Sequence, residues 1–281
     1  MSSVADAEDL IVLVIVAFVP ALIYLSWVRR TERYGREAWG PLLRAFFYGA
    51  LFATVVAAIL EAVIVYAGTA VSTTYPAPEF VFLNGNSNVG ALFLVLVIAP
   101  FIEEALKASG VVSFRSRFKQ VADGPVFGAS VGLGFGFFET FLYGLGAFLV
   151  GGLAAGIVLI LIRSVSSVLL HGSSTGMFGY GYARSKFRIR GPGSGAYYLV
   201  AVGMHATFNL LASLAAILTI VGVSGFASDA ASYLALFAAI FFAFWAIEHV
   251  RSIIQTADYP ALLTGAPPFT NPSRPKPPRP S

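Results

Sequence analysis

The sequence predicts an all-α membrane protein, a polytopic bundle of about seven transmembrane helices. Of its 281 residues, 57% are hydrophobic and only 11% are charged, and the mean hydropathy is +0.80. Soluble domains carry charge on about a quarter of their residues. The net charge of +4 does not indicate a nucleic-acid partner, because the Lys and Arg residues lie mostly in short segments between apolar stretches. The bilayer is therefore the expected environment of this chain.

Seven apolar stretches follow one another along the chain, and each is long enough to cross the hydrocarbon core as a helix. They comprise residues 10–28, 42–71, 89–110, 124–148, 156–183, 196–222 and 231–250. The first stretch is expected to be a membrane anchor and not a removed signal peptide, because it lacks a small-residue cleavage site. Residues 72–88, rich in Pro, Gly and Asn, are expected to form a loop, and residues 149–155 a short Gly-rich turn.

The fourth stretch carries small residues at every fourth position. They are Gly128, Gly132, Gly136, Thr140 and Gly144. Such a stripe favours close packing of one helix on another in a membrane. Glu139 lies seven residues from Gly132 and so falls on nearly the same side, which predicts that its side chain faces protein and not lipid.

The distribution of basic residues predicts the orientation in the membrane. The loops after the first, third and fifth stretches and the C-terminal segment hold nearly all Lys and Arg, whereas residues 72–88, 149–155 and 223–230 hold none. Because cytoplasmic loops collect positive charge, the N-terminus is expected outside and the C-terminus in the cytoplasm. Residues 1–258 are expected to form one helical domain, and the Pro-rich residues 259–281 a disordered tail.

Three ionisable residues within the third stretch are the first functional signal. On a helix, Glu103 and Lys107 lie one turn apart with Glu104 beside them, so the lysine can neutralise one carboxylate and leave the other free. A structural ion pair needs only one carboxylate, so the second indicates another purpose. Pro100 has no backbone N–H, so it is expected to free a carbonyl group one turn earlier and to kink the helix beside the carboxylate pair.

Other polar side chains are expected at a similar depth. Glu139, His171 and His205 lie between the centre and the cytoplasmic third of their stretches, and Asn209 follows His205 by one turn. Taken alone, each would be a group for hydrogen bonding between helices. Together, two histidines and a carboxylate are the ligand count of a catalytic zinc site. There are no cysteines to bind a metal.

These residues predict hydrolysis of a peptide bond inside the membrane. Glu139, His171 and His205 are the candidate zinc ligands, and Glu103 is the candidate base for the attacking water. Lys107 is expected to hold Glu104.

Four motifs then occur in order on successive stretches. They are Glu103-Glu104-x-x-Lys107, Phe135-x-x-x-Glu139, His171 and His205-x-x-x-Asn209. In these motifs, and in the segment that begins at Glu32, the chain resembles the PrsW-type intramembrane metalloproteases. That family is related in fold to the type II CAAX prenyl endopeptidases and to the helical scaffold subunit of gamma-secretase.

The resemblance implies a glutamate-dependent protease that cuts membrane-anchored proteins, anti-sigma factors being the family's known substrate class. It assigns Glu103 and Glu104 to the catalytic pair and Glu139, His171 and His205 to the remainder of the site. It also implies an integral protein of the plasma membrane of a prokaryote.

Three alternatives stay open. In a metal-free version of the same hydrolase, Glu103 is the base and His205 with Asn209 forms an oxyanion site. A non-catalytic membrane scaffold of the same fold is the second alternative. A transporter is the third, because charged residues inside a membrane also mark transport pathways.

Overall fold

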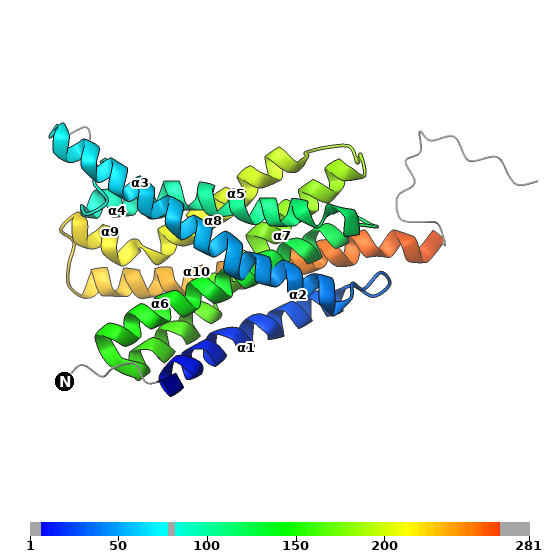
Figure 1. The fold of residues 1–281 in the computed structure, drawn as a ribbon, viewed down its shortest axis with the longest axis horizontal. Coiled ribbons are helices and arrows are strands. Elements are labelled where there is room, and N and C mark those ends of the chain that lie inside the picture. The colour runs from blue at the N-terminus through cyan, green and yellow to red at the C-terminus, as the bar shows by residue number, and fades with distance from the viewer. Residues whose placement is uncertain (1–6, 78–81, 265–281) are drawn as a thin grey trace, which may run out of the picture.

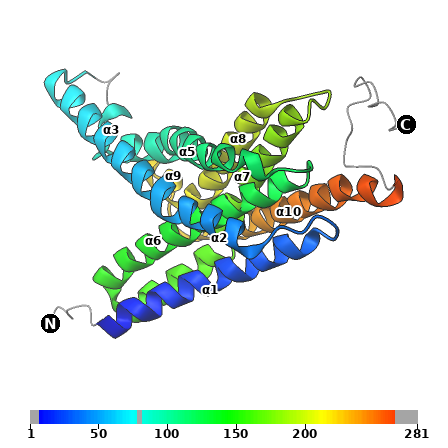
Figure 2. The same ribbon diagram turned by 45° about the vertical axis from the view of Figure 1, so that its right-hand side comes forward.

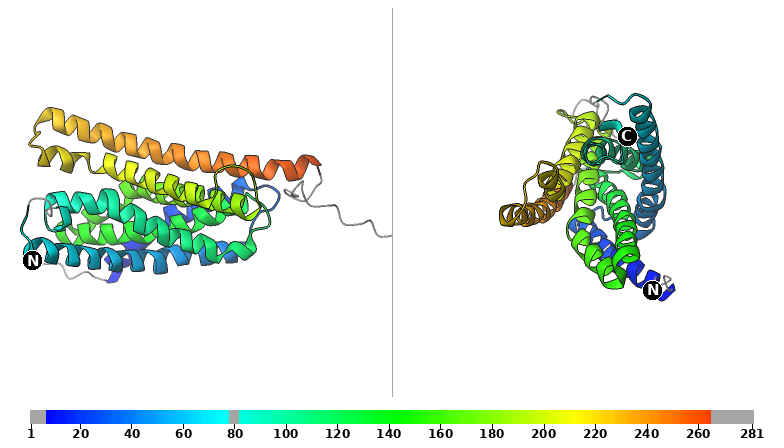
Figure 3. Two further views of the ribbon diagram at one scale, coloured as in Figure 1. Left: turned by 90° about the horizontal axis from the view of Figure 1, so that it is seen from above. Right: turned by 90° about the vertical axis from the view of Figure 1, so that its left-hand side faces the viewer.

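The structure is a computed structural model that describes residues 7–77 and 82–264, and all regular secondary structure within these residues is helical. The elements are α1 (Ala7–Thr31), α2 (Trp39–Phe47), the π-helix η1 (Tyr48–Ala53), α3 (Thr54–Thr74), α4 (Asn88–Phe93), the π-helix η3 (Leu94–Ile98), α5 (Ala99–Ser113), the 3-10 turn η4 (Arg115–Arg117), α6 (Asp123–Ser164), α7 (Ser167–Lys186), α8 (Ser194–Ala212), α9 (Leu214–Ile220) and α10 (Phe226–Thr264). The all-α prediction is confirmed. Most helices run along one long axis of the molecule (Figures 1 and 3).

Five helical segments of the described chain are long and apolar enough to cross a membrane, and six if α8 and α9, bent by 59° to each other, count as one span. One of the five, Asp123–Lys186, contains Gly152, whose φ of +78° interrupts the helix. Gly144 lies against Ile160 and Gly156, so the two halves of α6 pack on each other around this break. The predicted turn at residues 149–155 is thus confirmed. The count of seven spans and the orientation stay predictions.

The C-terminal helix α10 is longer than the apolar stretch that predicts it. It continues to Thr264, past the predicted start of the tail at residue 259. Residues 265–281 of that predicted tail lie outside the described residues.

The centre of the bundle is the packing of α6 on α7, with α1 along the other side of α6 (Figure 2). The small-residue stripe forms this contact. A Cβ atom at Gly132 would lie 2.0 Å from the backbone oxygen of His171, and one at Gly128 would lie 2.3 Å from that of Thr175. Only glycine allows the two backbones to approach this closely. The stripe thereby fixes the position of His171.

Gly132→Ala is expected to destabilise the protein by about 1–3 kcal/mol and to reduce any activity that depends on His171, because backbone atoms cannot yield to the added methyl group. The measurement is thermal unfolding in detergent. Gly146→Ala on the same helix is the matched control, since nothing lies within 4 Å of its Cβ position. Equal melting temperatures for the two variants would contradict this account.

Beyond the end of α1, a buried polar cluster joins three distant parts of the chain. The Nε2 atom of Gln120 donates hydrogen bonds to Glu32 Oε1 at 3.3 Å and to Asp258 Oδ1 at 3.2 Å. Asp258 Oδ2 in turn accepts the backbone N–H of Arg33 at 2.8 Å. Asp123 accepts the backbone N–H of Gln120 through Oδ2, at 3.0 Å. This cluster fixes the segment between α1 and α2 against α6 and α10.

Burial and the neighbouring Asp123 carboxylate raise the pKa of Glu32 from 4.5 to about 8. The native state therefore binds one proton more than the unfolded state between these two pH values, and stability is expected to fall as the pH rises through this window. In the Glu32→Gln variant, the drop in melting temperature from pH 5 to pH 8 should shrink by roughly 3 °C or more. Thermal unfolding of both proteins across that range is the measurement, and parallel curves would refute the assignment.

Candidate active site

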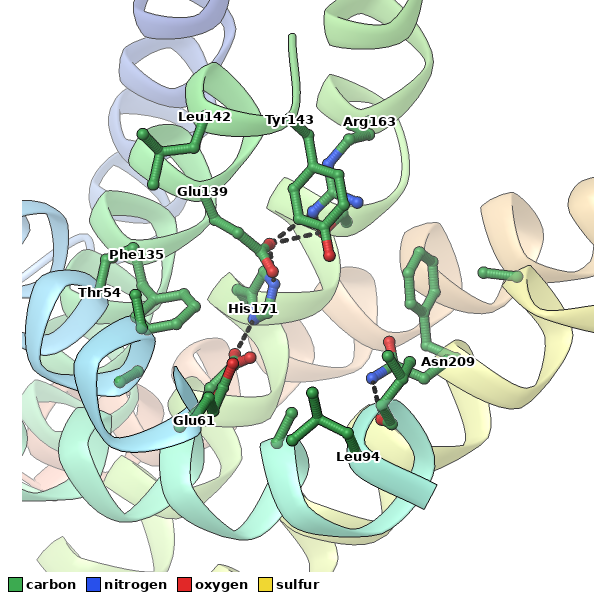
Figure 4. A pocket seen from close by; sticks show the side chains of 18 of the residues that line it. Thr54, Glu61, Leu94, Phe135, Glu139, Leu142, Tyr143, Arg163, His171 and Asn209 are labelled. Atoms are coloured by element: carbon green, nitrogen blue, oxygen red, sulfur yellow. Dashed lines mark hydrogen bonds and ion pairs between the residues drawn. The ribbon is translucent and has the colours of Figure 1, made fainter. Parts of the chain in front are cut away.

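A cavity of about 410 Å³ lies among α3, η3, α5, α6, α7 and α8. Its ionisable and amide-bearing lining side chains are Glu61, Glu103, Glu139, Tyr143, Arg163, His171 and Asn209, most of which are labelled in Figure 4. The predicted site residues Lys107 and His205 lie directly behind this lining, in contact with Glu103 or His171, and both contact Glu104. The structure thus brings all of the predicted site residues into one region.

Lys107 is the centre of the charged network and is fully buried. Its Nζ atom lies 2.8 Å from Glu104 Oε1, 3.6 Å from Glu103 Oε2 and 2.9 Å from His171 Nδ1. It also lies 4.3 Å from the centre of the Phe135 ring, on whose face a cation is favoured. The predicted pairing with one carboxylate is seen at Glu104, which accepts a hydrogen bond from Lys107. Glu103 is not entirely free of the lysine, because Oε2 forms the longer ion pair, but that atom has no hydrogen-bond partner.

The two histidines are each oriented by a carboxylate. His205 Nδ1 lies 3.0 Å from Glu104 Oε1, and His171 Nε2 lies 2.9 Å from Glu139 Oε2. Because an ionised carboxylate only accepts, these two nitrogens carry the protons. The remaining nitrogens, Nε2 of His205 and Nδ1 of His171, lie 3.9 and 4.0 Å from Glu103 Oε2. A carboxylate behind each imidazole is the usual arrangement for histidines that bind a metal.

Glu103, His171 and His205 together offer three ligand atoms within 4.8 Å of one another, and all three residues are buried. This set differs in one member from the predicted ligands, because Glu103 takes the place of Glu139. Glu139 is instead held by Arg163 Nη2 at 2.5 Å and by His171. Arg163 reaches Glu139 because the chain reverses at Gly152. The spacing of these residues in the sequence does not predict this ion pair.

Glu104 and Asn209 are the other two predicted catalytic residues, and both already have protein partners. Glu104 Oε1 accepts hydrogen bonds from Lys107, Ser174 and His205. Asn209 Nδ2 donates to the backbone oxygen of Val95 at 2.8 Å. Their contacts are those of groups that position other side chains.

The hydrogen bond from Asn209 to the Val95 oxygen is possible because residue 100 is a proline. In η3, the N–H of Ala99 bonds five residues back to the oxygen of Leu94, so the next position in this register would bond to Val95. Proline at position 100 has no N–H, and the oxygen of Val95 is left for Asn209. The predicted freeing of a carbonyl is confirmed, and it ties α8 to the helix that carries Glu103.

Among the ionisable side chains that line the cavity, Glu61, Tyr143 and Arg163 were not predicted as part of the site. Glu61 lines the cavity from α3, and a lone acidic residue in an apolar stretch is a signal that sequence analysis can use. The centre of the Tyr143 ring lies 4.0 Å from the guanidinium carbon of Arg163. This contact depends on the packing of the two halves of α6, and no pattern in the sequence predicts it.

The model of one protein family, described as PrsW family intramembrane metalloprotease, matches residues 37–246. The chain belongs to the PrsW family. The match covers every helix that contributes to the cavity, including α3 with Glu61. A relative named Protease PrsW, from Clostridioides difficile (strain 630), is 27% identical over 134 residues.

That alignment covers 47% of this chain and 50% of the relative, so the chain matches about half the length of that PrsW protein. No solved structure is significantly similar to the chain.

Proposed function

We propose that this PrsW-family chain is an intramembrane endopeptidase that hydrolyses peptide bonds of membrane-anchored proteins. The observation that carries the proposal is the buried group of Glu103, His171 and His205 at the cavity, with a carboxylate behind each histidine. A water molecule and a peptide carbonyl need such a polar site to react within an apolar bundle. Membrane-anchored regulators of the anti-sigma-factor type, in the plasma membrane of a prokaryote, are the substrates that the resemblance suggests.

The charges around the cavity fit a divalent cation. Within the described part of the chain, the carboxylates Glu61, Glu103, Glu104 and Glu139 face two cationic side chains, Lys107 and Arg163. With all of these groups ionised and both histidines neutral, the site carries two surplus negative charges, and such a surplus is costly in a low-dielectric interior. Two imidazoles and one carboxylate are the ligand types of catalytic zinc sites, so Zn²⁺ is the expected metal.

In this proposal, Glu103, His171 and His205 hold the metal, which when bound polarises the carbonyl group and lowers the pKa of water. Glu104 and Glu139 fix the proton positions on the two imidazoles. Arg163 neutralises Glu139 and keeps it in place behind His171. Lys107 keeps Glu104 ionised in the interior.

One observation favours the metal-free version of the same hydrolase. Lys107 Nζ lies 2.9 Å from His171 Nδ1, and this hydrogen bond uses the lone pair that a metal would need. In that version Glu103, whose Oε2 atom has no hydrogen-bond partner, is the group that activates water.

Elemental analysis of the purified wild-type protein beside His205→Ala tests the metal, and cleavage of a membrane-anchored reporter in proteoliposomes tests the activity. About one zinc per chain, lost in the variant, together with chelator-sensitive cleavage, is the expected result. Cleavage without metal would establish the metal-free version. A folded wild type that neither binds metal nor cleaves would indicate a scaffold, and solute uptake that survives Glu103→Gln would indicate a transporter.

A further inference from the structure

Glu61 is the one carboxylate lining the cavity, among the described residues, that has no protein partner. Its Oε1 atom is buried and receives no hydrogen bond, and no described Lys, Arg or His side chain lies within ion-pair distance of it. Figure 4 shows it among the side chains that surround the cavity together with His171. An ionisable group kept in this state within a membrane helix indicates function.

The position of Glu61 on α3 is fixed by the helix repeat. Thr54, Ala57, Ala58 and Glu61 all line the cavity, and they lie three or four residues apart. This spacing places them on one face of α3. The helix packs against η1 and α5, the second of which carries Glu103. Glu61 therefore faces the reaction site and not lipid.

The other carboxylates of the site have protein partners. Glu104 accepts three hydrogen bonds, and Glu139 is held by Arg163 and His171. Glu103 Oε2 lies 3.9 Å from His205 Nε2 and 4.0 Å from His171 Nδ1, and Glu103 is the carboxylate of the proposed metal set. Peptide hydrolysis still requires a group that takes a proton from water and delivers it to the leaving nitrogen. Glu61 is left for that task.

We propose that Glu61 is the general base and general acid of the hydrolysis, an inference that rests on the proposed endopeptidase function. The Glu61 carboxylate accepts one proton from water as the water oxygen bonds to the peptide carbonyl carbon. It then donates this proton to the amide nitrogen as the carbon–nitrogen bond breaks. A carboxylic acid and an amine leave, and Glu61 is ionised again.

The test compares Glu61→Gln with wild type in proteoliposomes that contain a membrane-anchored reporter. Three quantities are measured: kcat, KM and zinc content. The expected result is a fall in kcat of roughly 10²–10⁴-fold, the usual contribution of acid–base catalysis, with zinc content and KM near those of wild type. Glu61→Asp, which keeps the carboxylate, should recover part of kcat. Glu248→Gln is the matched control, because Glu248 is exposed on α10 and its one ion pair among the described residues is with Arg251.

Several results would overturn the assignment. If Glu61→Gln keeps kcat within about threefold of wild type while Glu103→Gln is inactive and still binds zinc, Glu103 is the base and the endopeptidase function stands. If only KM rises, and only for reporters with Lys or Arg near the cut, Glu61 binds substrate and does not transfer protons. If wild type itself cleaves no reporter, the endopeptidase function fails, and the role of Glu61 fails with it.

Discussion

Glu103→Gln is expected to reduce cleavage of a membrane-anchored reporter by at least roughly 10²–10⁴-fold while the protein still folds. The reason lies in its contacts. Glu103 Oε2 has no hydrogen-bond partner, and it lies 3.9 Å from His205 Nε2 and 4.0 Å from His171 Nδ1. In the metal-bound version the variant lacks a charged metal ligand. In the metal-free version it lacks the base that activates water. Both versions predict the same loss of activity.

Zinc content separates the two versions in this variant. If Glu103 is a ligand, Glu103→Gln should bind zinc more weakly than wild type, and added zinc should restore none or little of the activity. The control is Glu248→Gln, which removes an exposed carboxylate of the same type from α10. An active Glu103→Gln protein would exclude both roles and would leave the structural ion pair as the function of this residue.

The sequence was sufficient to predict interactions that are local along one helix. Lys107 lies three and four residues from its two carboxylates, and the helix repeat places them on one side. Pro100 frees the oxygen of Val95 by its own chemistry. The glycine stripe was visible as a repeat that predicts close helix packing, and the structure adds that its partner is the segment of α7 around His171. In each case the local rule predicts the feature itself, and the packing of the bundle decides its partner on another helix.

Interactions that depend on where the chain reverses were not predictable in this way. The pairing of Arg163 with Glu139 requires the break at Gly152 and the register of the two halves of α6. For the same reason, the choice between Glu139 and Glu103 as the carboxylate nearest both histidines needed the packed bundle. The contact between Gln120 and Asp258, which are 138 residues apart, belongs to the same class.

Lys107→Met is expected to have the largest effect on stability, a loss of about 3–5 kcal/mol, because the variant leaves carboxylates buried without their cation. Lys107 is fully buried and contacts Glu104, Glu103 and His171. Methionine has a similar length and apolar stem, so the packing against Phe135 changes little. Thermal or denaturant unfolding in detergent is the measurement. Lys119→Met is the matched control, because the Lys119 side chain is 79% exposed and its pairing with Glu37 is worth about 1 kcal/mol or less.

The double variant Lys107→Met with Glu104→Gln separates charge from packing. Glu104 Oε1 accepts hydrogen bonds from Lys107, Ser174 and His205, so a neutral amide at this position removes the buried charge while its oxygen keeps two donors. If the cost of Lys107→Met is electrostatic, the double variant should recover at least half of the lost stability, a coupling of about 1.5 kcal/mol or more. No recovery would mean that the lysine stabilises the bundle through its contact with His171. Unchanged stability in the single variant would mean that the two carboxylates are not held as charged groups at all.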